Sequence, residues 1–415
     1  MRNLRIGLLL GFRQIQRASL WTTLLIIFVM MLTFLNLIAV SGILVGLIAG
    51  AERAVRHESL GDIVITAKSG EDRILETNSL ERQLSTFPEV QDYSTRYQSV
   101  ALLEANYKER RDLSGERDTA NVNVTGINPI NEAEMSGLEG NLISGEYLEP
   151  DDEGYILVGV YYLEEWAIKF GDIFDSVENI KPGVTVRLST GDTSKEFIVK
   201  GIIESKVDQV SLNTYIPERE FRRLFKRTDR NADQIVIRVA EQGQEITVRD
   251  SLLKSGLGEY AKIQTYDESK PKFITDIKTT FNILGTFIGS VGIIVASITI
   301  FIIIFINALS RRRHIGILKG IGIKRSVIEI AYVLQAAFYA LAGSALGALL
   351  TYGFLVGYFE SNPIQFPFSD GILVAPAGET FLRFVVLFVI TLIAGFLPAW
   401  MIVRQNTLNS ILGRK

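Results

Sequence analysis

The feature that most constrains this 415-residue sequence is a set of four long stretches without a charged residue. They are 18–51, 279–310, 330–359 and 384–403. A membrane-spanning helix needs about 20 apolar residues, and core helices of soluble proteins rarely stay uncharged for so long. The first stretch is also far longer than the apolar part of a signal peptide, about 7–15 residues. We therefore predict an α-helical membrane protein with four transmembrane helices.

Three short basic segments lie on one side of these four stretches. Arginine and lysine gather in 1–17, in 311–325 and in 404–415, and these segments share one side if every stretch crosses the membrane once. By the positive-inside rule that side is the cytoplasm. The other side receives 52–278 and the acidic loop 360–383. We expect a multi-pass protein of a prokaryotic cytoplasmic (inner) membrane, with both termini in the cytoplasm.

These patterns divide the chain into nine segments. The first two apolar stretches are longer than a bilayer requires, so each is expected to protrude as one leg of a stalk. The predicted segments are a cytoplasmic amphipathic helix (1–17), transmembrane and stalk helix 1 (18–51), a large extracytoplasmic domain (52–270), stalk and transmembrane helix 2 (271–310), a cytoplasmic segment (311–328), transmembrane helix 3 (329–359), an extracytoplasmic loop (360–383), transmembrane helix 4 (384–403) and a cytoplasmic tail (404–415).

The segment 52–270 has the composition of a soluble domain. Short β-branched runs separated by turn residues indicate strands, and amphipathic runs between them indicate helices. This mixture predicts an α+β domain, of one or two subdomains, inserted between transmembrane helices 1 and 2. The predicted strands are 61–66, 122–127, 184–188, 197–203 and 234–239, and the predicted helices are 79–87, 161–170 and 218–225.

The sequence offers little material for catalysis. It has no cysteine and only two histidines, His57 and His314, which lie far apart. The acidic run 151–153 is better explained as a solvated turn than as a cation site. A net charge of −3 gives no general attraction to nucleic acid. We predict no catalytic, metal-binding or cofactor-binding residues, and hence a protein that is not an enzyme.

Glycines recur at intervals of four within three of the apolar stretches. Such spacing places them on one helix face, where a second helix can approach closely. No charged residue lies within any of the stretches, whereas proton relays and ion pathways usually need one. The glycines favour tight packing between helices or between protomers. They are Gly42, Gly46 and Gly50 in the first stretch, Gly285 and Gly289 in the second, and Gly343 and Gly347 in the third.

The basic segment after the second stretch carries a recognisable motif. Residues 311–322 read Arg-Arg-Arg-His-Ile-Gly-Ile-Leu-Lys-Gly-Ile-Gly. This motif resembles the signature of FtsX-like/MacB-like ABC transporter permeases, although His314 stands where that family usually has an acid. The glycine-rich third stretch, and Leu397-Pro398-Ala399 near the end, are similar to the same family. Residues 156–172 and 184–203 resemble its MacB-like periplasmic core domain.

The resemblance implies a permease subunit that transmits ATP-driven motion from a cytoplasmic ABC ATPase to the extracytoplasmic domain. Its task would be export or extraction of a lipid, lipoprotein, peptide or drug. The alternatives are an FtsX-like regulator of a periplasmic or cell-wall enzyme, and a membrane-anchored receptor or adhesin without energy coupling.

Several partners follow from the same resemblance. The sequence lacks Gly-x4-Gly-Lys-(Ser/Thr), so we expect ATP to be bound by a partner chain and no cofactor by this one. A second permease protomer, identical or different, is expected, with an extracytoplasmic client or adaptor of unknown identity. The residues expected to couple to the ATPase are Arg313, Ile315, Gly316, Ile317, Leu318, Lys319, Ile321 and Gly322.

Overall fold

The computed structural model describes residues 2–108, 118–166, 175–191, 193–366, 369–371 and 373–404. These residues fall into two units. The helical unit comprises the described parts of 1–49, 276–366 and 370–415, and the α+β domain comprises those of 50–275 together with Ser369. Of the predicted tail 404–415, residues 405–415 lie outside the described part.

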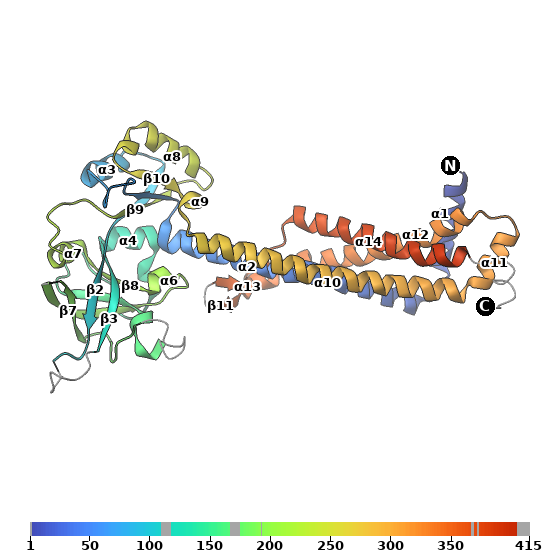
Figure 1. The fold of residues 1–415 in the computed structure, drawn as a ribbon, viewed down its shortest axis with the longest axis horizontal. Helices are drawn as coiled ribbons and strands as arrows, with labels where there is room; N and C mark the ends of the chain where they lie inside the picture. Colours follow the sequence, from blue (N-terminus) through green and yellow to red (C-terminus); the bar gives the residue numbers. More distant parts are fainter. Residues whose placement is uncertain are drawn as a thin grey trace. The chain divides into compact units, whose positions relative to one another are not determined.

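Four long helices form most of the helical unit. They are α2 (Leu20–Val55), α10 (Lys272–Ser310), α12 (Arg325–Leu350) and α14 (Ala377–Val403) (Figure 1). A π-helical turn (Thr351–Leu355) continues α12 into α13 (Val356–Ser361), and two short strands follow, β11 (Ile364–Phe366) and β12 (Ser369–Gly371). Within the described residues, four helices are long and apolar enough to cross a membrane. The prediction of four such helices is therefore confirmed.

Two of these helices begin earlier than the apolar stretches indicated. The α12 helix starts at Arg325, and α14 starts at Ala377, before the predicted residue 384. Charged residues in the first turns of α14 ended the apolar stretch but not the helix. There Arg383 Nη2 donates to Glu379 Oε2 at 3.0 Å, one helical turn away, which favours helix at this end.

A small N-terminal helix packs on the helical unit. It is α1 (Arg2–Gln16), which corresponds to the predicted segment 1–17. Gly7 and Gly11 face α12 so closely that a Cβ atom would lie 2.7 Å from Ile330 Cγ2 and 2.8 Å from Leu334 Cδ2, respectively. The opposite side leaves Phe12 59% exposed. The helix therefore has a glycine face against α12 and an apolar face that is largely exposed.

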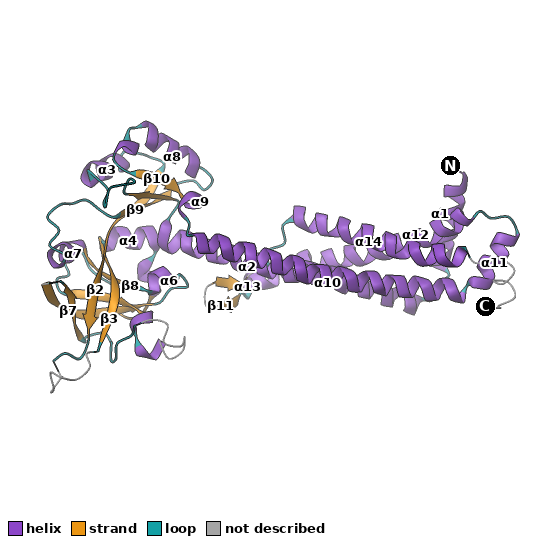
Figure 2. Cartoon of the chain, viewed as in Figure 1, coloured by secondary structure: helices purple, strands orange, loops and turns teal. Residues whose placement is uncertain are grey.

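The α+β domain contains a ten-stranded sheet, with its strands gathered in one body in Figure 2. The strand order is β10-β1-β9-β2-β3-β8-β5-β7-β4, and β6 pairs with both β2 and β7. The strands are β1 (Ile63–Thr66), β2 (Val90–Glu104), β3 (Thr119–Ile127), β4 (Leu142–Gly145), β5 (Tyr155–Gly159), β6 (Thr185–Thr190), β7 (Thr193–Ile203), β8 (Asn213–Pro217), β9 (Gln234–Val239) and β10 (Lys262–Thr265).

One long strand joins the two halves of this sheet. The first half of β2 pairs antiparallel with β9, and its second half pairs antiparallel with β3. Because both halves share β2, 50–275 forms a single unit. Helices are interspersed: α3 (Thr77–Leu84), α4 (Pro129–Ser136), α6 (Asp208–Ser211), α7 (Glu218–Leu224), α8 (Glu245–Lys254) and α9 (Tyr266–Ser269).

The predicted elements of this domain are largely present. All five predicted strands correspond to observed ones, and 79–87 and 218–225 correspond to α3 and α7. The prediction of a helix over 161–170 is tested only in part, since 167–170 lie outside the described residues and 160–162 form a 3-10 turn. The central strand β2 was not predicted, because its polar outer positions give a weak apolar signal.

Candidate functional site

The motif-bearing segment folds as a short helix, α11 (Arg312–Gly320), between α10 and α12. Gly322 ends it with φ of +89°, a conformation that favours glycine. The N–H of Ile323 then donates to the carbonyl of Leu318 at 3.1 Å, which closes the helix end. Lys324 is extended, and α12 begins at the next residue. The segment is thus a compact helix–turn between two long helices.

The inner face of α11 packs on the helical unit. Ile315 is 3% exposed and belongs to the same apolar core as α2, α12 and α14. Leu318 is half-buried against that core. Lys319 Nζ donates to the carbonyl oxygen of Val403, the last residue of α14, at 3.0 Å. Burial lowers the pKa of Lys319, and the nearby charge of Arg325 lowers it further. These contacts tie α11 to the end of α14.

The outer face of α11 is exposed and partly apolar. Ile317 is 48% exposed and Ile321 is 71% exposed, at positions one turn apart. Arg313, His314 and Gly320 are also exposed beside them. We call these five residues the docking face. Exposed isoleucines flanked by the cationic side chain of Arg313 are suited to a protein partner with an apolar groove and an acidic rim.

The predicted coupling residues are therefore divided between two faces. Arg313, Ile317 and Ile321 lie on the docking face. The inner, buried part of the set consists of Ile315, Gly316, Leu318 and Lys319, and Gly322 forms the turn. The sequence motif thus combines residues that hold α11 in place with residues that stay exposed on its outer face.

The predicted packing glycines mostly contact other parts of the same chain. A Cβ atom on Gly343 would lie 2.4 Å from Met30 Cβ, so this glycine allows α12 to approach α2. Gly347 likewise faces Phe34, and Gly285 and Gly289 face α2 near Leu44 and Leu37. Gly42 instead faces residues 373–374, where the N–H of Val374 donates to the Gly42 carbonyl at 3.1 Å. Gly46 is buried and Gly50 is half-buried.

One important packing glycine was not predicted. A Cβ atom on Gly395 of α14 would lie 2.5 Å from Ala336 Cβ of α12. This residue has no glycine partner four positions away, so the spacing pattern could not identify it. The close approach of α14 to α12 at this point therefore depends on a glycine that the spacing pattern does not include.

The α+β domain holds the last residues of α2 and the residues just before α10. Arg56, in the π-helical turn (Arg56–Leu60) after α2, donates to Asp62 Oδ1 at 2.6 Å and is also paired with Glu245. The Tyr266 hydroxyl donates to the carbonyl of Glu52 at 3.1 Å, and Lys270 Nζ lies 3.7 Å from Glu52 Oε1. The end of α2 is thus joined by polar contacts to the segment that leads into α10.

A buried ion pair also holds the π-helical turn that follows α2. Arg96 Nη2 lies 2.6 Å from Glu132 Oε1, and the hydroxyls of Ser94 and Ser136 also donate to Glu132. Arg96 further donates to the carbonyl of Ser59 in the π-helical turn. Burial would raise the pKa of Glu132, but the charge of Arg96 and these hydrogen bonds outweigh it and lower the pKa. The pair fastens the turn to β2 and α4.

The described ranges contain no group of three or more His, Asp or Glu side chains placed to hold a metal ion. The exposed, partly apolar outer face of α11 suits a protein partner rather than a small ligand.

Comparison with known proteins relates part of the chain to a family. Residues 286–407, which include most of α10 and all of α11, α12 and α14, match the family described as FtsX-like permease C-terminal. Among curated proteins, the chain is 23% identical over 228 residues to the macrolide export ATP-binding/permease protein MacB of Campylobacter jejuni, which covers 52% of this chain and 34% of that protein. It is 24% identical over 144 residues to the ABC transporter permease YtrF of Bacillus subtilis, covering 32% of each.

The chain spans about a third of the length of these curated relatives. Among solved structures, the periplasmic region of MacB from Actinobacillus actinomycetemcomitans aligns with a TM-score of 0.35 and 20% identity, covering 51% of this chain and 92% of that one. The predicted resemblance is confirmed by the family match and by the curated relatives. The chain is similar to the FtsX-like/MacB-like ABC transporter permeases, and the family match covers residues 286–407.

Proposed function

We propose that this chain is a permease subunit that transmits motion from a separate cytoplasmic ABC ATPase to its α+β domain. In this proposal α2, α10, α12 and α14 span the inner membrane with both termini in the cytoplasm. The clusters of arginine and lysine in 1–17 and 311–325 support this orientation. The α+β domain then lies outside the cytoplasm, where it acts on a lipid, lipoprotein, peptide or drug that is exported or extracted.

The observation that carries the proposal is the docking face of α11. Its isoleucines are exposed at the end of the helical unit where basic residues gather, whereas Ile315 on the same helix is buried. A segment that served only to set topology would need the arginines but not exposed isoleucines. An ATPase groove that received Ile317 and Ile321 would bury them, and Arg313 at the rim would favour association with an acidic partner.

The remaining contacts provide a route for the motion. Movement of α11 would reach α14 through Lys319 and Val403, and the other helices through Ile315 in the shared core. The helices α2 and α10 contain 36 and 39 residues, more than the roughly 20 that a bilayer requires. Arg56 and Tyr266 then attach the helix ends to the α+β domain. A second permease protomer is part of the proposal, because such ATPases close as dimers.

Replacement of Ile317 by aspartate tests the docking face. A charge at this position would lie unpaired in the contact, which costs a few kcal/mol and predicts loss of ATPase capture of at least about tenfold. The measurement is copurification of the partner ATPase from native membranes, together with its turnover. The matched control is Ile246→Asp, since Ile246 of α8 is 62% exposed in the α+β domain. Equal ATPase capture by Ile317→Asp and the wild type would refute the proposed docking.

A further inference from the structure

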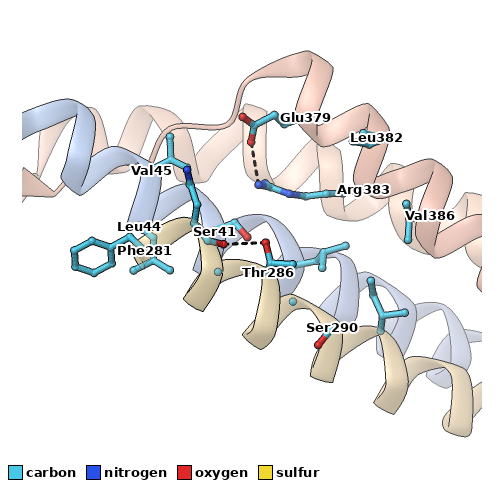
Figure 3. Close-up of a pocket in the computed structure, with 15 residues that line it drawn as sticks. Ser41, Leu44, Val45, Phe281, Thr286, Ser290, Glu379, Leu382, Arg383 and Val386 are labelled. Atoms are coloured by element: carbon cyan, nitrogen blue, oxygen red, sulfur yellow. Dashed lines mark hydrogen bonds and ion pairs between the residues drawn. The ribbon is translucent and has the colours of Figure 1, made fainter. Parts of the chain in front are cut away.

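The helical unit contains a hollow that the coupling mechanism does not use. It has a volume of about 480 Å³ and lies between α2, α10 and α14 (Figure 3). Leu37, Leu44 and Ile293 form apolar parts of its wall, joined by Leu382, which is 63% exposed, and Val386. Gly285 and Gly289 lie in the lining, and the absence of a side chain at each leaves room beside α2. An acyl chain fits such a surface by its apolar character.

The same hollow has a polar side. Ser41, Asn282, Thr286 and Ser290 line it together with the ion pair of Glu379 and Arg383 (Figure 3). Arg383 Nη1 is buried and has no hydrogen-bond partner among the described residues. A buried donor without an acceptor is costly, and an anionic oxygen would satisfy it. The opposite charge of Glu379 lies beside it, so the site presents a cation and an anion together.

We infer that this hollow binds one phospholipid whose head group carries both a phosphate and a primary ammonium group. The phosphate would accept from Arg383, the ammonium would donate to Glu379, and an acyl chain would lie along Leu382 and Val386. The adjacent opposite charges favour this zwitterionic head group over an anionic one. An anionic head group could pair with Arg383 but would bring no cation to pair with Glu379. A quaternary ammonium head has no N–H to donate. The inference rests on the proposed membrane insertion but not on ATPase coupling.

The hollow lies at a position along the helices where a phospholipid head group is expected. The ion pair lies in the first turns of α14, before the apolar stretch 384–403, and therefore at a membrane interface in the proposed topology. Interfaces are where lipid phosphate groups lie. Phe281 and Asn282 of α10 line the hollow as well, and they too lie toward the outer end of that helix.

Native mass spectrometry of the full chain tests the site. The detergent-purified protein is titrated with dioleoyl phosphatidylethanolamine, phosphatidylglycerol or phosphatidylcholine. We expect one preferred adduct with phosphatidylethanolamine, weakened about tenfold by Arg383→Gln, which removes a charge-assisted hydrogen bond. Gly289→Leu, which fills the hollow, should abolish the preference. Arg404→Gln, which changes an arginine at the other end of α14, should leave it intact.

Glu379→Gln gives the sharpest outcome. It leaves Arg383 without its carboxylate, so the preference should reverse in favour of phosphatidylglycerol. The chain has no cysteine, so a bimane on Ser290→Cys is a unique reporter, and phosphatidylethanolamine with brominated chains should quench it in vesicles. Equal adducts with all three lipids, or an adduct unaffected by Arg383→Gln and Gly289→Leu, would overturn the inference. Loss of ATPase capture alone would leave it standing.

Discussion

At the scale of single residues, the charged groups of this chain have different roles according to their burial. Arg96 and Glu132 are almost completely buried and held by several hydrogen bonds, whereas Arg73 and Asp229 form a half-exposed pair. Removing one member of a buried pair leaves an uncompensated charge, but exposed pairs contribute little. The effect of an ion pair on stability therefore depends on how deeply its two side chains are buried.

Glu132→Gln is expected to destabilise the α+β domain by about 3–5 kcal/mol, because Arg96 loses its counter-charge in a buried site. Thermal or denaturant unfolding of the full chain in detergent, followed by the near-UV signal of the α+β domain, measures this loss. Arg73→Ala is the control and should change stability by less than about 1 kcal/mol. A similar small effect of both substitutions would show that the buried pair does not fasten the π-helical turn.

The lowered pKa of Glu132 predicts that the free energy of unfolding depends on pH. The pKa of Glu132 is lower in the folded chain than in the unfolded one, so its contribution is complete above the unfolded pKa of about 4.3. The contribution is lost as pH falls through the lower, folded pKa. Unfolding measured from pH 7 down to acid should therefore show a stability loss below about pH 4 that Glu132→Gln removes. An identical acid dependence in both proteins would contradict this assignment.

At the scale of elements, glycine determines how closely the helices pack. Gly343→Ala would place a Cβ atom 2.4 Å from Met30 Cβ and is expected to cost about 1–3 kcal/mol, since α12 must move away from α2. Gly353→Ala is a matched control, because no atom lies within 4 Å of the added Cβ. Thermal stability in detergent provides the comparison. If Gly343→Ala has the stability of the control, the predicted close contact is absent.

The contact between α11 and α14 predicts a selective loss of coupling. Lys319→Met removes the hydrogen bond to the Val403 carbonyl, worth about 1 kcal/mol, but leaves the docking face unchanged. We expect the partner ATPase to bind normally while its stimulation by the permease falls severalfold. Lys324→Met, at an exposed lysine, should change neither the binding of the ATPase nor its stimulation by the permease. Normal stimulation in Lys319→Met would exclude this contact from the transmission route.

The sequence predicted these elements unevenly. Charge-free length was sufficient for four helices, and the motif at 311–322 located α11. Glycine spacing identified Gly343 and Gly347 as packing residues but could not tell whether a helix, a loop or another protomer would face them. The start of α14 was missed because Arg383 and Glu379 neutralise each other only when they lie one helical turn apart. Their role in lining a hollow depends on α2 and α10, which are distant in sequence.

At the scale of the whole molecule, the proposed contact between α11 and a cytoplasmic ATPase depends on the direction in which the chain crosses the membrane. Because the sequence has no cysteine, single cysteines report accessibility without background. Cysteines at Ser69, Ser194 and Ser361 should react with an impermeant thiol reagent from outside the cell, whereas those at Ser326 and Ser410 should react only after lysis. The opposite pattern would invert the proposed orientation and place α11 outside the cytoplasm.

The proposed function requires that the outer face of α11 contacts an ABC ATPase. A photo-crosslinking amino acid at Ile317, activated in living cells, tests this contact when adducts are identified by mass spectrometry. We expect one dominant adduct with an ABC ATPase, present at Ile317 and at Ile321 and absent when the crosslinker replaces Ile246. Adducts without an ATPase at Ile317 and Ile321, or the same adducts from all three positions, would contradict it.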